Sequence, residues 1–158
     1  MTLRFGILTI SDRSSRGERE DKSGPALREK ILALGWQVDQ LDIIPDDLLV
    51  IQDTLVRWVD SHGLDVILTS GGTGFSPRDV TPEATQAVIE RPSPGMAEAM
   101  RAASLKITPH AMLSRAVAGI RGKTLIVNLP GSPKAALENL DVIQPVLPHA
   151  VQLLQEDW

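Results

Sequence analysis

Apolar and polar positions along this chain follow two patterns, which alternate from one end to the other. Short, nearly continuous apolar runs bounded by polar or glycine-rich turns are typical of buried strands. Such runs predict strands at 3–10, 36–44, 65–68 and 123–129, with a more ambiguous strand-like pattern at 114–120. Apolar side chains spaced three and four residues apart predict helices that begin near residues 24, 45, 82, 96 and 133.

Helix-breaking residues and polar clusters mark the connections between these elements. Residues 11–22 are polar and carry both charge signs, which predicts a loop. Gly35 is expected to end the first helix, as glycines commonly do. The segment 91–95 should break the chain between two helices, and Pro145 and Pro148 should split or kink the last helical region.

The alternation of strands and helices predicts an α/β protein, a three-layer α/β/α sandwich with a mostly parallel central sheet. The chain has 158 residues, of which 42% are hydrophobic, and this is enough for one domain with a core of its own. It contains no internal repeat, low-complexity segment or linker. We therefore expect residues 1–158 to form a single domain.

Composition excludes several classes of function. The net charge of −4 gives no reason to expect nucleic-acid binding, and an aromatic content of 3% argues against a base-stacking surface. The chain has no cysteine, so a thiolate nucleophile, an iron–sulfur cluster and a disulfide are excluded. No secretory signal and no apolar run near the ~18 residues of a membrane span is visible. We expect a cytoplasmic protein that does not contact membranes.

The segment from Thr69 to Thr81 carries the strongest functional signal. Its sequence Ser70-Gly71-Gly72-Thr73-Gly74 follows a predicted strand, and three glycines within four residues allow a sharp turn and close approach to a ligand. The backbone amides and hydroxyl groups of this loop are suited to binding an anion. Arg78 and Asp79 then add a phosphate-pairing group and a possible metal ligand, before a helix with Thr81 as N-cap and Pro82 as first residue.

This glycine-rich loop differs from the best-known phosphate-binding motifs. No lysine follows Gly74, which excludes a P-loop, and the loop follows the third predicted strand rather than the first, unlike a dinucleotide-binding fingerprint. A tight strand-to-helix turn without a ligand is the alternative interpretation. The neighbouring Arg78 and Asp79 favour a phosphate or nucleotide site.

Two further loops are expected at the same edge of the sheet, because the carboxyl ends of parallel strands lie together. The segment Asn128-Leu129-Pro130-Gly131-Ser132-Pro133 joins a strand to a helix, with Ser132 as the expected cap and Pro133 as the first helical residue. Ser11 and Asp12 follow the first strand, and Ser23-Gly24 begins the next helix. For residues 14–20 we favour a solvated loop without a function.

Two adjacent aspartates follow the second predicted strand. Asp46 or Asp47 is expected to cap the helix that begins there, while the alternative is binding of Mg²⁺ opposite Asp79. The histidines are scattered without a metal-binding or triad order, so none is expected to be a ligand or a general base. Trp36 and Trp58 are interpreted as packing residues.

Several ordered motifs resemble the molybdenum-cofactor biosynthesis family of the MogA/MoaB type, whose domain also occurs in gephyrin-type molybdenum-insertion proteins. The resemblance covers nearly the whole chain, from Ile7 to the final helix. The motifs that carry it are Thr69-Ser70-Gly71-Gly72-Thr73-Gly74, Arg78-Asp79-Val80-Thr81-Pro82-Glu83-Ala84, Pro94-Gly95-Met96, Leu113-Ser114-Arg115-Ala116 and Asn128-Leu129-Pro130-Gly131-Ser132-Pro133.

The resemblance implies a three-layer α/β fold assembled as a homotrimer or hexamer, and contact with other enzymes of molybdenum-cofactor synthesis. It also implies a nucleotidyltransferase that uses ATP and Mg²⁺ to adenylylate molybdopterin with release of pyrophosphate. Asp79 and Asp46 match the two aspartates of the family that act in catalysis and metal binding, with Asp47 as a neighbouring alternative for the second. The expected substrate- and nucleotide-binding residues are Ser11, Asp12, Ser70, Gly71, Gly72, Thr73, Gly74, Arg78, Asn128, Pro130, Gly131 and Ser132.

Other functions remain as alternatives. A protein of the same fold can bind molybdopterin or assemble with partners without adenylyl transfer. A pterin-free nucleotide hydrolase or deamidase is a third interpretation, although nothing in the chain supplies an appended catalytic domain. A Rossmann dehydrogenase fits least, because the fingerprint after the first strand is absent.

Overall fold

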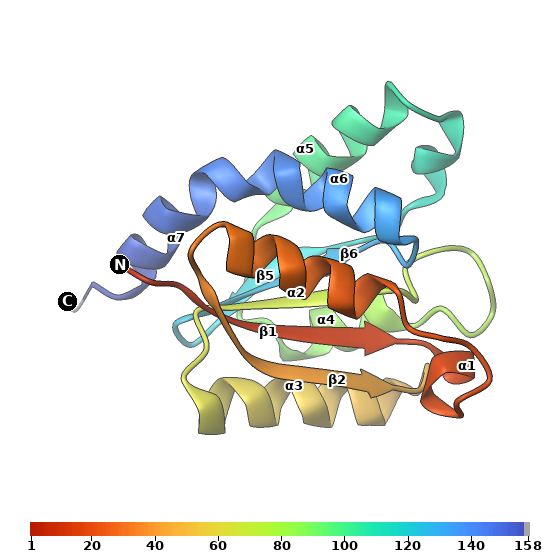
Figure 1. Ribbon diagram of the computed structural model, residues 1–158, viewed down its shortest axis with the longest axis horizontal. Coiled ribbons are helices and arrows are strands. Elements are labelled where there is room, and N and C mark those ends of the chain that lie inside the picture. Colours follow the sequence, from red (N-terminus) through yellow and green to blue (C-terminus); the bar gives the residue numbers. More distant parts are fainter. Residues whose placement is uncertain (157–158) are drawn as a thin grey trace.

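Six strands form one sheet in the computed structural model, which describes residues 1–156 (Figure 1). The strands are β1 (Arg4–Ile10), β2 (Gln37–Ile44), β3 (Val66–Ser70), β4 (Arg91–Pro92), β5 (Ala118–Arg121) and β6 (Thr124–Leu129). Their order in the sheet is β2-β1-β3-β6-β5-β4. The first four in this order are parallel, whereas β5 runs antiparallel to β6 and to β4. The expected mostly parallel sheet is confirmed.

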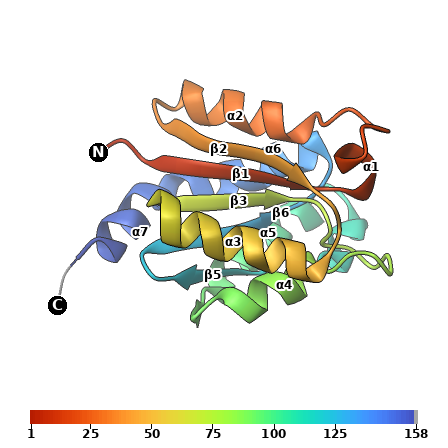
Figure 2. The ribbon, with the colours of Figure 1, turned by 90° about the horizontal axis from the view of Figure 1, so that it is seen from below.

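Helices cover both faces of the sheet (Figures 1 and 2). The α-helices are α1 (Asp12–Ser15), α2 (Ser23–Ala33), α3 (Leu48–His62), α4 (Thr81–Val88), α5 (Pro94–Leu105), α6 (Pro133–Ile143) and α7 (Leu147–Leu154), and the 3₁₀ helices are η1 (Pro109–Leu113) and η2 (Gln144–Val146). Helices α2, α5, α6 and α7 lie on one face, while α3 and α4 lie on the other. The three-layer sandwich is therefore confirmed.

Alternating side chains of the strands divide the core into two apolar clusters. Phe5 and Leu68 belong to the cluster under α2, α6 and α7, whereas Leu8 and Ile67 belong to the cluster under α3 and α4. This period of two follows from the pleat of the strands. Because both faces are covered, the central strands are apolar throughout, which is why the sequence shows continuous apolar runs rather than alternation.

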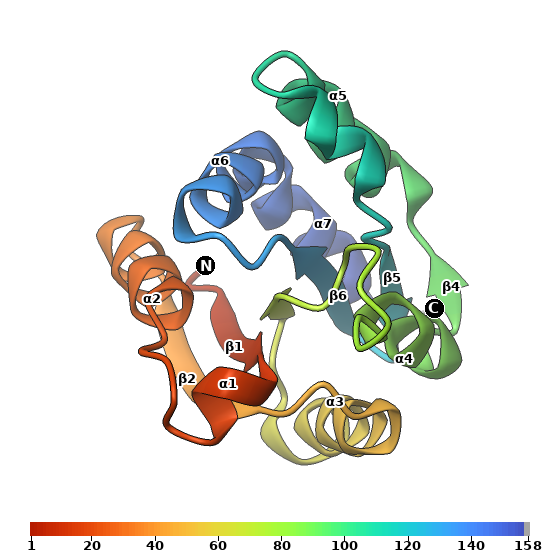
Figure 3. The same cartoon turned by 90° about the vertical axis from the view of Figure 1, so that its right-hand side faces the viewer.

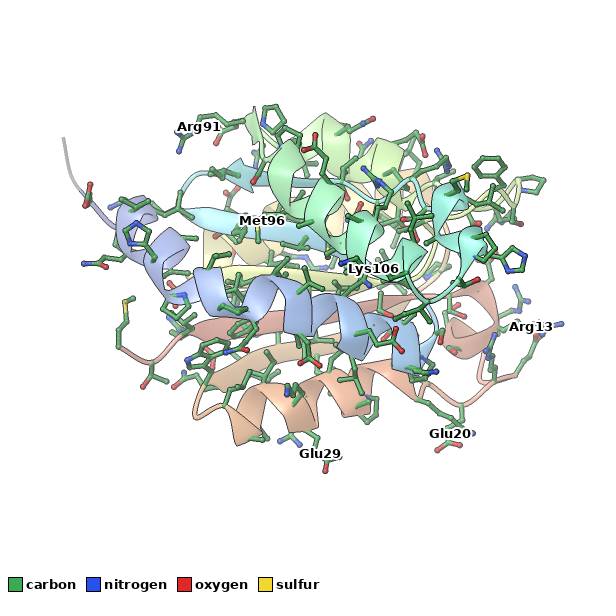
Figure 4. The ribbon with its side chains drawn as sticks, turned by 90° about the horizontal axis from the view of Figure 1, so that it is seen from above. Arg13, Glu20, Glu29, Arg91, Met96 and Lys106 are labelled. Carbon is green, nitrogen blue, oxygen red and sulfur yellow. The ribbon has the colours of Figure 1, made fainter. Side chains whose placement is uncertain are left out.

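Trp36 and Trp58 pack in the core, as expected. Trp58 is buried in the α3 side of the core, and Trp36 stacks on Phe5 with ring centroids 5.4 Å apart. Met100 is buried in the opposite cluster, against which Met96 is packed (Figure 4). No helix within residues 1–156 is long and apolar enough to cross a membrane.

The expected break between two helices at 91–95 is confirmed, and it contains the short strand β4. Three other local predictions were wrong. The segment 11–22 is not only a loop, because α1 forms at its start. The strand expected at 114–120 lies at 118–121. Thr81 is not the N-cap of α4 but its first residue, because its hydroxyl donates to the Gly71 carbonyl (2.9 Å) instead of capping the helix.

Four parallel strands end at one edge of the molecule, which Figure 3 shows facing the viewer. The register pairs Ile10 with Ile44, and it aligns Ser70 with Leu129, so the chain leaves β1, β2, β3 and β6 at nearly the same level. The ladder even continues beyond the strands, since Ser11 N–H donates to Ile44 O (2.9 Å). The loops that follow these strands are therefore brought together.

Candidate functional site

A cavity of about 670 Å³ opens at the carboxyl ends of β1 and β3. Strand order reverses between these two strands, since β2 lies on one side of β1 and β6 lies beyond β3. Such a reversal leaves a crevice in which α/β proteins bind ligands. Eight of the residues proposed from the sequence line this cavity: Ser11, Asp46, Ser70, Gly71, Gly72, Asp79, Gly131 and Ser132.

Glycines form the floor of the cavity because the backbones there approach one another too closely for side chains. A Cβ on Gly71 would collide with the carbonyl oxygen of Ile10, and one on Gly131 would lie 3.3 Å from Gly71 Cα. Gly71 and Gly72 also have φ angles of +106° and +70°, which side-chain-bearing residues rarely adopt. The N–H of Gly71 donates to Leu129 O (3.1 Å). This amide therefore joins the loops after β3 and β6 to each other.

Asp46 and Asp12 bind each other reciprocally across the ends of β1 and β2. The N–H of Asp12 donates to Oδ2 of Asp46, and the N–H of Asp46 donates to Oδ1 of Asp12, both at 2.9 Å. Arg78 donates to both carboxylate oxygens of Asp12, at 3.0 and 3.1 Å. Its guanidinium holds the pKa of Asp12 below the usual range. Arg78, which was expected to pair with phosphate, is paired with a carboxylate in the structure.

Asp46 is half-buried, and one of its carboxylate oxygens lacks a hydrogen-bond partner within residues 1–156. Burial raises the pKa of Asp46, and the negative charges of Asp12 and Asp79 raise it further, against the lowering effect of the hydrogen bond from the Asp12 amide. Oδ1 of Asp46 is buried without a hydrogen-bond partner among the described residues. A buried polar atom without a partner is rare and calls for an explanation. The neighbouring Asp47 is exposed and caps α3 by accepting from Val50 N–H (3.0 Å).

Serine hydroxyls join the loops around the cavity. Ser70 Oγ donates to Pro130 O (2.8 Å), and Ser23 Oγ donates to Gly131 O (2.6 Å). Ser132 is the N-cap of α6, as expected, and its Oγ accepts from Ala135 N–H at 3.4 Å. These bonds fix the turn at 130–132 between β3 and α2.

The remaining residues proposed from the sequence do not line the cavity. Asn128 is fully buried and donates to the hydroxyls of Thr69 and Thr85, both at 3.0 Å, while its Oδ1 accepts from Val117 N–H. It holds the ends of β3 and β6 and helix α4 together, so its amide group is engaged within the fold. Four more lie in the loops around the cavity without lining it, and Asp12 is the first residue of α1. The four are Thr73, Gly74, Arg78 and Pro130.

Sequence reasoning missed one wall of the cavity. Ser14, Arg19, Glu20, Asp21 and Lys22 line it, although residues 14–20 were expected to have no function. Figure 4 shows Arg13 and Glu20 at the end of the molecule where the strands terminate, whereas Glu29 lies along α2.

Asp21 anchors this wall. Its carboxylate accepts from Thr9 Oγ1 (2.9 Å) and from the N–H groups of Ser23 and Gly24 (3.1 Å each). The available signal was the spacing of Asp21 before Gly24, since an acidic side chain two to three residues ahead of a helix start typically accepts from the first free amides.

Comparison with known proteins identifies the family of this chain. Residues 6–149 match the protein family described as "Probable molybdopterin binding domain". The molybdopterin adenylyltransferase of Helicobacter pylori strain J99 is 43% identical over 155 residues, which cover 97% of this chain and 88% of that protein. The crystal structure of the molybdopterin biosynthesis enzyme MoaB from Thermus thermophilus has a TM-score of 0.92, with 51% identity and 99% of both chains covered.

A longer relative contains the same domain. The molybdenum cofactor synthesis protein cinnamon of Drosophila melanogaster is 46% identical over 157 residues, which are 99% of this chain but only 26% of that protein. The segment that matches the family includes every residue that lines the cavity. The chain therefore belongs to the family of molybdopterin-binding domains.

Proposed function

We propose that this protein transfers the adenylyl group of ATP to molybdopterin and releases pyrophosphate, with Mg²⁺ bound by Asp46 and Asp79. The observation that carries the proposal is the unpartnered, buried Oδ1 of Asp46 in a cavity at the strand-order reversal. Relatives named molybdopterin adenylyltransferase, which match nearly the whole chain, support the same activity.

The carboxylate oxygens of Asp46 and Asp79 are ligands that suit Mg²⁺. This ion is usually held by one or two carboxylates, while waters and substrate phosphates complete its coordination. Asp46 and Asp79 both line the cavity, and Asp79 lies near enough for its charge to raise the pKa of Asp46. A cation between them would satisfy Oδ1 of Asp46 and remove the repulsion between the carboxylates. Within residues 1–156 no three acidic or histidine side chains converge, so further ligands would come from the nucleotide and water.

The walls of the cavity suit anionic reactants. Arg19 and Lys22 line it, and neither side chain has an ion-pair or hydrogen-bond partner in the described part of the chain. The N-terminus of α6 reaches the cavity through Ser132, and N–H groups at a helix start favour phosphate. The first N–H groups of α2 are already bound by Asp21. We assign the nucleotide phosphates to the glycine floor beside Gly72, and the anionic end of the pterin substrate to the wall that carries Arg19.

The reaction requires no protein nucleophile. A phosphate oxygen of molybdopterin attacks the α-phosphorus of ATP, and the bond from that phosphorus to the oxygen bridging to the β-phosphate breaks. Pyrophosphate leaves with that bridging oxygen, and the adenylyl group stays on the pterin phosphate. When bound, Mg²⁺ would supply neutralisation of the charge that develops on the phosphates. The protein's own contribution is to hold two mutually repulsive anions in line, which alone can lower a barrier by several kcal/mol (about 7–11 in favourable cases).

A pyrophosphate assay tests the proposal against its alternatives. Purified protein is mixed with molybdopterin, ATP and Mg²⁺, and both pyrophosphate and the adenylylated pterin are measured. We expect equal amounts of the two products, and no product after chelation of Mg²⁺. Binding of molybdopterin without pyrophosphate would instead identify a non-catalytic binding or assembly protein. Nucleotide hydrolysis without the pterin would identify a hydrolase.

Three expectations from the sequence and the resemblance stay predictions. They are the homotrimeric or hexameric assembly, the contact with other enzymes of molybdenum-cofactor synthesis, and the cytoplasmic location. Light scattering of the purified protein tests the first, and cell fractionation tests the last.

A further inference from the structure

Arg115, which lies between η1 and β5, binds the loop that carries Asp79 at several points. Its backbone N–H donates to Thr73 O (2.8 Å). Its guanidinium donates from Nε to Gly74 O (2.8 Å) and from Nη2 to Asp79 O (2.7 Å), and its Nη1 pairs with Glu83 Oε2 at 2.6 Å. One side chain therefore connects both ends of the loop 74–79 to the first turn of α4.

The other side-chain contact of this loop with the rest of the fold is the pairing of Arg78 with Asp12. Its middle, residues 75–78, is exposed, and Phe75 is 69% exposed. Inside the loop, the N–H of Ser76 donates to Oδ2 of Asp79 (3.0 Å), and the N–H of Asp79 donates to Ser76 O (2.9 Å). These two bonds orient the Asp79 carboxylate relative to the turn at residues 76–79. The position of the turn relative to the sheet depends on the bonds that come from Arg115 and on the pairing of Arg78 with Asp12.

Glu83 holds the guanidinium in the orientation that reaches both carbonyls. The Arg115 guanidinium in turn keeps the pKa of Glu83 below its usual range, so this carboxylate is ionised at neutral pH. An arginine is required for such an arrangement, because its planar group presents several N–H donors in a fixed fork. A lysine carries the same charge but presents a single ammonium, which cannot reach two carbonyls and a carboxylate at these separate positions.

We propose that Arg115 is a positioning residue for adenylyl transfer, which holds Asp79 opposite Asp46 by binding the carbonyls of Gly74 and Asp79. Arg115 does not line the cavity, so it acts through the loop rather than on the substrates. The inference rests on the proposed function of the cavity. It goes beyond that function because it assigns to Arg115 the placement of the Asp79 carboxylate relative to that of Asp46.

The test compares Arg115→Lys with Arg121→Lys. Arg121 is a matched control, because its Nη1 also donates to a backbone carbonyl, that of Val88 (2.9 Å), and it contacts neither Asp79 nor its loop. Hydrogen exchange of the ligand-free protein is measured at the amides of Ser76 and Asp79. The rate of pyrophosphate release is then measured as a function of Mg²⁺ concentration.

For Arg115→Lys we expect exchange at Ser76 and Asp79 to accelerate about tenfold, the effect of losing one hydrogen bond to a charged group. We expect the half-saturating Mg²⁺ concentration to rise several-fold and kcat to fall by roughly 10²-fold, as a displacement of about 1 Å can produce. The affinity for molybdopterin measured without Mg²⁺ should stay unchanged. Arg121→Lys should leave all four quantities as in the wild type.

Three results would overturn the inference. Unchanged exchange at Ser76 and Asp79 would show that Arg115 does not hold the loop. If the wild type releases pyrophosphate and Arg115→Lys has the same half-saturating Mg²⁺ concentration, the position of the loop does not depend on Arg115 for Mg²⁺ binding. Exchange that accelerates equally throughout the chain would identify a general structural role. If the wild type itself releases no pyrophosphate, the proposed function fails, while the exchange measurement still decides whether Arg115 fixes the loop.

Discussion

Asp46 and Asp47 show how two identical neighbours acquire different roles. Successive residues of an extended segment point to opposite sides, so only one of the two can face the cavity. Asp47 faces solvent and caps α3, whereas Asp46 faces inward and is bound to Asp12. The sequence placed both residues at the correct turn and left their roles open. The choice depends on backbone direction after Pro45, which no local pattern encodes.

Replacing Asp46 by asparagine should raise the stability of the ligand-free protein at neutral pH. Because burial raises the pKa of Asp46 above its unfolded value, ionisation in the folded state carries a cost. The stability that protonated Asp46 contributes is fully present below its pKa in the unfolded chain. It is lost as the pH rises through the pKa of Asp46 in the folded protein. The Tm of Asp46→Asn should therefore exceed that of the wild type by roughly 2–4 °C near neutral pH, the effect of about 1 kcal/mol in a domain of this size.

Thermal melting without Mg²⁺ checks this, with Asp47→Asn as the control that changes an exposed carboxylate and keeps a good helix cap. The melting temperatures of wild type and Asp46→Asn should converge as the pH is lowered. A variant that melts below the wild type at every pH would show that the carboxylate carries no such cost.

Gly72→Ala should damage both stability and nucleotide binding. A Cβ at this position would collide with Thr81 Oγ1 and lie 3.0 Å from Oδ1 of Asp46, on a backbone with φ of +70°. Gly35→Ala is the matched control, because Gly35 has a similar φ of +83° and open space around it. Both variants should lose about 1–2 kcal/mol to backbone strain, and only Gly72→Ala should bind ATP more weakly. Equal ATP affinity in the two variants, measured by titration calorimetry, would contradict the assignment of this loop.

At the scale of elements, the long buried strands were predictable and the short elements were not. Strands such as β3 and β6 are apolar along their whole length because both faces are covered. Helix α1 has four residues, too few for a periodic pattern, and forms where Asp12 meets Asp46 and Arg78. The strand expected at 114–120 starts later, because Arg115 is bound to the glycine-rich loop instead of a neighbouring strand.

The cavity wall that carries Arg19 and Lys22, in the segment between β1 and α2, should determine the affinity for the anionic substrate. Arg19→Ala and Lys22→Ala should each raise KM roughly two- to fivefold with little change in kcat, as expected for an exposed charge worth up to about 1 kcal/mol. The effect should shrink at high salt, which screens such charges. Arg28→Ala removes an exposed cation of α2 away from the cavity and serves as control. A KM equal to that of the wild type in both wall variants, at low salt, would contradict the assignment.

At the scale of the whole molecule, strand order decides where the site lies. The sequence predicted strands, helices and loops that gather at one edge, and the reversal between β1 and β3 places the cavity there. Eight of the proposed residues line the cavity, but the sequence could not separate them from neighbours that do not, because that depends on the register and facing of each strand. Asn128, for example, ends a strand beside the cavity yet points between β6 and α4.

The most direct test compares pyrophosphate release by Asp46→Asn, Asp79→Asn and Asp47→Asn in the presence of molybdopterin, ATP and Mg²⁺. All three remove one negative charge, but only the first two change a carboxylate that lines the cavity. We expect Asp46→Asn and Asp79→Asn to fold, to bind molybdopterin and to release no pyrophosphate, while Asp47→Asn keeps wild-type turnover. Full turnover by folded Asp46→Asn or Asp79→Asn would contradict the claim that these carboxylates hold the metal for adenylyl transfer.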